Sequence, residues 1–343
     1  MVRSADMASC NFGCRSATLD GATEWQTVLA DAVRSPSELG RRLGLDLALV
    51  RAAEAAAAGF PLLVPQPYLD RMQPGDPADP LLLQVLPQGA ELDTVPGYSD
   101  DPLAEAAAMP APCLLRKYRG RSLMVASGAC GVHCRFCFRR HFPYINDDFA
   151  FGPALQTIAA DPSTHEVILS GGDPLMLDDR QLGDLIAELA EIPHLKRVRV
   201  HTRLPVAIPQ RITGELVHLL RGSRLAAIVV LHVNHPAEID EPVAAAFARL
   251  IDAGIPVLSQ SVLLQGVNDR VEVLAALCER LVDLRVMPYY LHQLDHVAGA
   301  SHFEVPVATG INLVEALRAR LPGYAMPRYV QETVGGAYKE PLA

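Results

Sequence analysis

Six short apolar or β-branched segments alternate with amphipathic helical stretches from Ser122 onward, and this alternation constrains the fold more than any other feature. The segments predicted as strands are 122–127, 166–170, 197–201, 226–231, 256–262 and 285–290. Helices are predicted between them, among others at 179–192, 241–254 and 271–283. Crossovers of this length join neighbouring parallel strands, so the sequence predicts an α/β fold with a parallel sheet.

A TIM-like barrel, partial or complete, fits this alternation, and so does a doubly wound sheet. In a parallel barrel the active site lies at the C-terminal ends of the strands. The loops that directly follow the predicted strands are therefore expected to carry the chemistry.

The chain before the first strand follows a different pattern. We expect a disordered leader at 1–20 and a helical N-terminal region at 21–115, in which helical spacing is broken at Ser35-Pro36. Prolines are frequent between 61 and 112, which permits only short helices and turns there. The remaining boundaries predict the barrel at 116–325 and a short C-terminal segment at 326–343.

Composition excludes several classes of protein. The 343-residue chain has no apolar run long enough to span a membrane and no N-terminal pattern of a secretory signal, so we expect a soluble cytoplasmic protein. A net charge of -9 argues against direct binding of nucleic acid. Three of the seven cysteines fall within eight residues, which indicates thiolate ligands and not a disulfide framework.

Those three cysteines, Cys130, Cys134 and Cys137, lie just after the first predicted strand. Three thiolates on one short loop can bind three irons of a 4Fe–4S cluster and leave the fourth iron without a protein ligand. A zinc site is the alternative, but zinc requires a fourth Cys or His in tetrahedral geometry, and His133 lies inside the loop. The spacing therefore favours an iron–sulfur cluster.

This spacing, with an aromatic residue before the third cysteine, resembles the signature of the radical S-adenosylmethionine (SAM) superfamily. The resemblance implies a partial (β/α)6 barrel in which SAM binds the open iron and is cleaved reductively to a 5′-deoxyadenosyl radical. It also implies a SAM contact from the Gly-Gly-acidic motif after the second strand. The residues assigned to SAM are His133, Ser170, Gly171, Gly172, Asp173 and Gln260. For His232, Asn234 and His235, lining the same cavity and a structural role remain equally open.

Five further segments resemble the lysine 2,3-aminomutase family, and most closely its short branch, which supplies β-lysine for modification of elongation factor P. They are CRFCFRRHFPY (134–144), SGGDPLM (170–176), LHVNHPAEID (231–240), QSVLLQGVND (260–269) and MPYYLHQLDHVAGASHF (287–303). The resemblance implies an isomerase that converts (S)-α-lysine to β-lysine, expected to be the R isomer. It also implies an electron donor such as flavodoxin or ferredoxin, and a functional link to elongation factor P and its lysyl ligase.

The same resemblance assigns the second cofactor and the substrate. Lys339 is expected to bind pyridoxal 5′-phosphate (PLP) through an imine that stabilises the migrating radical. The cofactor's phosphate is assigned to Lys117, Tyr118 and Arg121. Arg139 is expected to bind the carboxylate of lysine, and Asp295 with Glu332 its ε-ammonium.

Three other interpretations remain at this point: a metabolic aminomutase that supplies free β-lysine, an enzyme for another substrate such as glutamate, and an iron–sulfur regulator without catalysis. A glutamate side chain would bring a third negative charge to Asp295 and Glu332, which is costly in a shielded site. The longer members' structural zinc is not expected, because Arg270 occupies the position of one of its cysteines. Cys10, Cys14, Cys113 and Cys278 receive no function.

Overall fold

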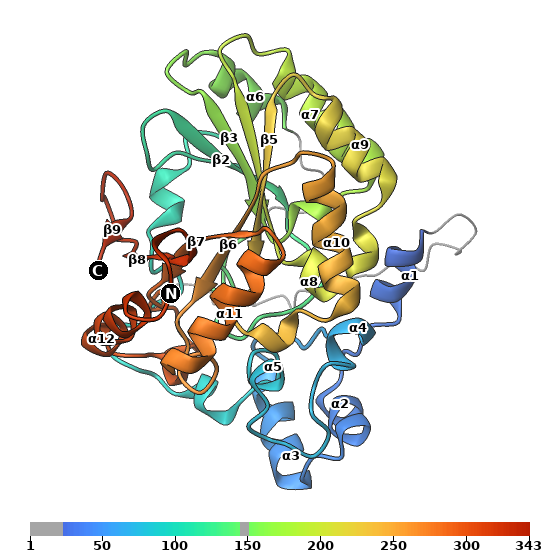
Figure 1. The fold of residues 1–343 in the computed structure, drawn as a ribbon, viewed down its shortest axis with the longest axis vertical. Coiled ribbons are helices and arrows are strands. Elements are labelled where there is room, and N and C mark those ends of the chain that lie inside the picture. The colour runs from blue at the N-terminus through green and yellow to red at the C-terminus, as the bar shows by residue number, and fades with distance from the viewer. Residues whose placement is uncertain (1–22, 145–150) are drawn as a thin grey trace, which may run out of the picture.

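The structure is a computed structural model that describes residues 23–144 and 151–343 (Figure 1). The predicted leader at 1–20, with Cys10 and Cys14, lies outside the described residues. None of the described helices has the length and the apolar character needed to cross a membrane.

The described residues form a single sheet with its nine strands in chain order. The six predicted strands are all present as β2 (Arg121–Ser127), β3 (Glu166–Gly171), β4 (Arg197–Thr202), β5 (Ala226–His232), β6 (Val257–Val262) and β7 (Met287–His292). Each pairs in parallel with the next. This order never reverses, as a doubly wound sheet's order would, so the fold is the barrel alternative.

Three short strands complete the sheet. β8 (Arg328–Gln331) adds a seventh parallel strand beside β7, a strand that the sequence did not predict. β1 (Leu114–Leu115) and β9 (Glu340–Pro341) pair antiparallel at the two edges. Among the described strands these two edges pair with one neighbour each, so the barrel is partial.

Helices cover the outside of the sheet, as the positions of α7, α9, α10 and α11 in Figure 1 show. They are α6 (Gly152–Ala159), α7 (Asp179–Ala190), α8 (Leu204–Ala207), α9 (Gly214–Gly222), α10 (Glu241–Asp252), α11 (Val271–Asp283) and α12 (Val307–Arg318). The predicted helices correspond to α7, α10 and α11. The side chains of Asp178 and Asp240 begin α7 and α10 by accepting hydrogen bonds from backbone N–H groups three residues later.

The N-terminal region consists of short helices, as predicted: α1 (Glu24–Ala30), α2 (Pro36–Leu43), α3 (Leu47–Ala57), α4 (Gln66–Leu69) and α5 (Pro80–Leu83). The break at Ser35-Pro36 is the start of α2, where the Ser35 side chain accepts from Glu38 N. Buried side chains of this region, such as Trp25 and Tyr68, belong to the same hydrophobic core as the barrel. The predicted domain boundaries stay predictions.

Two backbone hydrogen bonds attach this region to the cysteine loop. His133 N donates to Leu63 O at 3.0 Å, and Arg135 N donates to Gln84 O at 2.9 Å. The N-terminal region therefore lies against the C-terminal ends of the strands, where the functional site was expected.

Candidate functional site

A cavity of about 580 Å³ opens among the C-terminal ends of the strands and reaches into the barrel. Every residue that the sequence analysis assigned to the cluster, to SAM, to PLP or to lysine lines it. His232 lines it as well, whereas Asn234 and His235 do not. The fold therefore brings together segments up to about 220 residues apart in the chain, from Lys117 to Lys339.

The cysteine loop after β2 presents three free thiols to this cavity. Gly131 lets the loop pack closely against α8, because a Cβ there would force the end of the Leu204 side chain to move. Burial raises the pKa of the Cys134 thiol to about 11, and that of Cys130 well above its usual value, so bound metal is needed to make these thiols ligands.

The arrangement fits a cluster better than a single ion. Within 23–144 and 151–343, no three His, Cys, Asp or Glu side chains converge as ligands of one metal ion would. A 4Fe–4S cluster makes a different demand, because each thiolate binds a separate iron. Three free thiols on one loop, around one cavity, meet that demand.

Two glycines bring the end of β3 against the cysteine loop. Gly171 has φ +118°, a conformation that favours glycine, and a Cβ on Gly172 would overlap the Ala129 carbonyl. Asp173 N donates to that carbonyl oxygen at 2.8 Å. The Gly-Gly-Asp motif is therefore packed directly against the loop that would hold the cluster.

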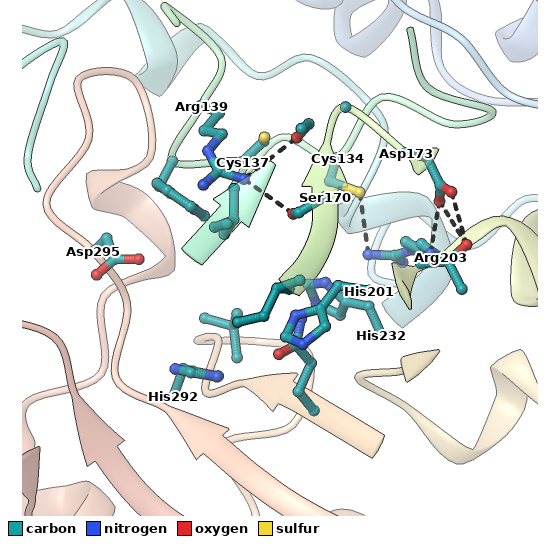
Figure 2. A pocket seen from close by; sticks show the side chains of 18 of the residues that line it. Cys134, Cys137, Arg139, Ser170, Asp173, His201, Arg203, His232, His292 and Asp295 are labelled. Carbon is teal, nitrogen blue, oxygen red and sulfur yellow. Dashed lines mark hydrogen bonds between the residues drawn. The ribbon is translucent and has the colours of Figure 1, made fainter. Parts of the chain in front are cut away.

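The Asp173 carboxylate accepts hydrogen bonds from other residues of the protein. It accepts hydrogen bonds from Thr202 Oγ1 at 2.8 Å and from Arg203 N at 2.8 Å, among others (Figure 2). Burial raises its pKa despite these donors. This acid joins the loops after β3 and β4, a role that the sequence analysis did not assign to it.

Arg139 has a buried partner that the sequence analysis missed. Its Nε and Nη2 donate to the two carboxylate oxygens of Glu105 at 2.7 and 2.9 Å, and its Nη1 donates to Ser170 Oγ at 3.1 Å. Burial opposes ionisation of Glu105, but Arg139 and Lys117 outweigh it and lower the pKa of the carboxyl. Arg139 therefore faces the cavity with its charge already paired with Glu105, a carboxylate that it shares with Lys117.

The opposite end of the cavity carries a different arrangement. Glu332 forms ion pairs with Lys339 and, at 2.8 Å, with Lys117, whose Nζ also lies 3.1 Å from Glu105. Although burial opposes ionisation, the two lysines lower the pKa of Glu332 to about 2. Glu332 is therefore ionised and already paired.

Asp295 is the second acid at this end (Figure 2). Burial, and then the negative charge of Glu332, raise the pKa of Asp295 to about 7. No described residue donates a hydrogen bond to its carboxylate. The Asp295 carboxylate thus faces the cavity without a hydrogen-bond or ion-pair partner among the described residues, although the charges of Lys339 and Lys117 limit the rise of its pKa.

Cationic and phenolic groups line the cavity beside Lys117. The Arg121 guanidinium lies 4.6 Å from the centre of the Tyr118 ring. Arg199, which the sequence analysis missed, pairs through Nη2 with Glu166 at 2.7 Å, but its buried Nε has no acceptor among the described residues. An anion such as phosphate would satisfy that donor, because an unpaired buried N–H is costly.

Three histidines at the ends of β4, β5 and β7 also face the cavity: His201, His232 and His292 (Figure 2). Burial, and then Arg203, lower the pKa of His232 to about 3, while burial lowers that of His201 and His292 well below the usual value. All three are therefore neutral. The sequence analysis missed His201 and His292, although both lie within the last two residues of strands whose C-terminal ends were expected to carry chemistry.

Asn234 and His235 have structural roles here. Asn234 is fully buried, donates to Gln84 Oε1 at 2.9 Å and accepts from Val262 N at 2.9 Å. His235 accepts from Ala237 N at 3.1 Å and begins a short 3-10 turn. Of the two alternatives left open for them, the structure shows the structural one.

Comparison with known proteins gives the chain its relatives. It is 45% identical over 314 residues to L-lysine 2,3-aminomutase of Haemophilus influenzae, covering 91% of this chain and 93% of that protein. The Escherichia coli protein of the same name is also 45% identical, over 93% of this chain and 94% of that protein. The Clostridium subterminale protein of that name is 37% identical over 93% of this chain and 77% of its own length. No protein-family model matches the chain.

Solved structures give weaker likenesses. Streptococcus suis SuiB bound to S-adenosylmethionine has a TM-score of 0.49 and 15% identity, covering 67% of this chain and 54% of that chain. A radical SAM methyltransferase from Sphaerobacter thermophilus has a TM-score of 0.46 and 18% identity, over 63% of this chain and 68% of its own.

Proposed function

The chain belongs to the L-lysine 2,3-aminomutase family, and on that premise we propose that it converts (S)-α-lysine to β-lysine. The observation that carries the proposal is the single cavity lined by three cysteines, one lysine with a Glu partner, and an acid without a partner. The identity to named aminomutases extends over 91 to 93% of this chain, which supports the proposal.

In this proposal the protein holds three groups. Cys130, Cys134 and Cys137 would hold a 4Fe–4S cluster, and Lys339 would bind PLP. SAM would be held by His133, Ser170, Gly171, Gly172, Asp173 and Gln260, and the phosphate of PLP by Lys117, Tyr118 and Arg121. When bound, the cluster and SAM supply a carbon radical, and PLP supplies an imine that stabilises the migrating centre.

The two ends of the cavity would orient lysine by opposite charges. Asp295 and Glu332 would bind the ε-ammonium, and the unpaired Asp295 carboxylate supports this because a buried anion attracts a cation strongly. Arg139 would bind the carboxylate. Its contacts with Glu105, Ser170 and the Gly171 carbonyl use all but one of its five N–H donors, so we expect one hydrogen bond there and not a bidentate pair.

The destination of the product is part of the proposal. The chain is 45% identical to the H. influenzae and E. coli relatives but 37% identical to the C. subterminale one, which is consistent with the resemblance to the short branch. We propose that (R)-β-lysine formed in the cytoplasm is passed to the lysyl ligase that modifies elongation factor P. Flavodoxin or ferredoxin would supply the electron.

The test is anaerobic reconstitution with iron, sulfide, PLP and SAM, followed by incubation with (S)-α-lysine and chiral chromatography of the products. We expect β-lysine, mainly the R isomer. Cleavage of SAM without β-lysine would point to another substrate, and absence of SAM cleavage under strong reduction would favour an iron–sulfur regulator. Incubating the product with elongation factor P and its ligase would then test its destination.

A further inference from the structure

Arg203, the first residue after β4, connects the N-terminal region to the cysteine loop. Its Nη1 donates to the sulfur of Cys134 at 3.2 Å (Figure 2). Among the three cysteines of the loop, Cys134 is the one whose sulfur accepts a side-chain hydrogen bond from a described residue. The guanidinium is buried, with the residue 6% exposed, so water screens its charge little.

The guanidinium is fixed from several sides. Nη2 donates to Gln84 Oε1 at 2.8 Å and to Tyr68 Oη at 3.1 Å, both from the N-terminal region. Its carbon Cζ lies 5.4 Å from the centre of the Phe136 ring. Arg203 therefore keeps its position over Cys134 without any ligand present.

Glu238 supplies the counter-charge. It is fully buried, its Oε1 lies 3.3 Å from Arg203 Nη2, and the same oxygen accepts from Gln84 Nε2 at 2.7 Å. Arg203 stands between this acid and the sulfur. Because Coulomb energies fall with distance, the cation dominates the potential at Cys134 and the anion reduces it.

We propose that Arg203 is a positioning residue that raises the reduction potential of the cluster through Cys134, and that Glu238 sets how far. Reduction adds one electron to the cluster, and part of that negative charge lies on the cysteine sulfurs. A cation that donates a hydrogen bond to one sulfur stabilises the reduced form more than the oxidised form. This inference rests on the proposed cluster and makes the N-terminal region part of the redox centre.

A direct contact with SAM is the rival role of Arg203. Its Nε is buried and has no acceptor among the described residues, and the SAM carboxylate could provide one. The two roles differ in one measurable respect, since tuning through the sulfur acts whether or not SAM is bound.

The experiment is a redox titration of the reconstituted cluster, followed by electron paramagnetic resonance, with and without SAM. In Arg203→Met, without SAM, we expect the ratio of reduced to oxidised cluster at a fixed potential to fall about tenfold, which is about 59 mV for a one-electron couple. For Arg203→Lys we expect a ratio between that of the wild type and that of Arg203→Met. Glu238→Gln, which keeps the shape of the side chain, should move the ratio upward.

Arg211→Met is the matched control, because Arg211 is equally buried but bonds to the Leu175 and Leu177 carbonyls and contacts none of the three cysteines. It should lose stability and keep the potential. If Arg203→Met does not fold, the Glu238→Gln shift decides.

Unchanged potentials without SAM, or shifts of both variants in the same direction, would overturn the inference. A rise in the SAM dissociation constant with an unchanged potential would assign Arg203 to SAM instead. If the wild-type protein forms no β-lysine while the variants show the expected shifts in reduction potential, the proposed substrate is refuted and this inference still holds.

Discussion

The two ends of the cavity satisfy their buried charges in opposite ways. At the cysteine end, acids pair with arginines: Glu105 with Arg139, and Glu238 with Arg203, although Glu105 also lies 3.1 Å from Lys117, which joins the two ends. At the lysine end, Glu332 is shared by Lys117 and Lys339, and Asp295 forms no ion pair with any described residue. The first end holds its acids in close ion pairs with arginine, while the second has an acid left to be matched.

This difference follows from what each end has to do. Guanidinium groups remain protonated in proteins and hold fixed, planar hydrogen bonds, so they suit groups that stay in place. Lysine and carboxyl groups shift their pKa values readily and can release partners, which suits an end where PLP and lysine are expected to bind. The contrast predicts that a substitution at the cysteine end should leave PLP bound, and that a substitution at the lysine end should leave the cluster bound.

The largest effect is expected for Cys134→Ala. It removes one of three iron ligands, so we expect loss of the cluster, of SAM cleavage and of β-lysine formation, while PLP still binds Lys339. Iron and sulfide content with the visible spectrum measures this. Replacing Cys278, which is buried on α11 away from the cavity, by Ala is the control and should change none of these properties. A full cluster with normal SAM cleavage in Cys134→Ala would contradict the assignment.

Lys339→Ala should impair the functions of the lysine end alone. Without the amine, PLP has no covalent attachment, so we expect loss of the absorbance of lysine-bound PLP and of β-lysine formation. The cluster and the cleavage of SAM without substrate should remain. Borohydride reduction followed by peptide mapping gives the attachment point directly. Recovery of the labelled cofactor on another lysine would show that the wrong residue was chosen.

Much of this site could be predicted because its residues follow predicted strands. All six predicted strands are present, the cysteine loop and the Gly-Gly-Asp motif lie at strand ends, and Gln260 lies within β6, two residues before its end. Lys339 and Glu332 were identified through the resemblance to the family, because no periodic pattern of apolar residues would have singled them out. β8 was missed because four residues of mixed polarity carry little pattern, and their pairing depends on β7.

The partners of the site residues could not be predicted. Glu105 precedes Arg139 by 34 residues, and Gln84 precedes Arg203 by 119, and nothing in the sequence marks either pair. Asp173 is a similar case, since its carboxylate bonds to the β4 loop. Such pairs are created by tertiary packing, so the ionisation of the site became apparent only with the structure.

Removal of either distal acid should have an intermediate effect. In Asp295→Asn and Glu332→Gln the ε-ammonium of lysine loses a charged partner in a partly dry site, which costs roughly 2–5 kcal/mol. We expect β-lysine formation to fall by roughly 30-fold or more, since about 1.4 kcal/mol corresponds to a factor of ten. Cluster content and SAM cleavage without substrate should persist in both.

The two variants also differ from each other. Glu332→Gln leaves Lys339 without its anion, while Lys117 still pairs with Glu105 at 3.1 Å, so we expect it to weaken PLP retention as well, whereas Asp295→Asn should not. Near-normal turnover in either variant, with both cofactors loaded, would mean that other residues bind the distal amine.

The smallest expected effect is a pH dependence that belongs to Asp295 alone. Its pKa of about 7 means that the carboxyl is largely neutral at pH 6 and ionised at pH 8, whereas Glu332, with a pKa of about 2, stays ionised throughout. A neutral Asp295 must lose its proton to pair with an ammonium. Lysine affinity of the PLP-loaded protein should therefore rise with pH, by up to about tenfold for each unit below 7.

The stability of the protein without PLP and lysine should change in the opposite direction. The folded protein binds the Asp295 proton more tightly than the unfolded chain does, because the pKa is higher in the folded state. The contribution of this group to the free energy of unfolding is therefore complete below about pH 4, the ordinary pKa of Asp. That contribution is lost as pH rises toward 7. Denaturant unfolding of wild type and Asp295→Asn across this range, beside lysine binding from pH 6 to 8, measures both slopes. If Asp295 titrates near its ordinary pKa, wild type and Asp295→Asn should show the same pH dependence of lysine affinity and of the free energy of unfolding. The acids of the distal end would then be as fully paired as those of the cysteine end.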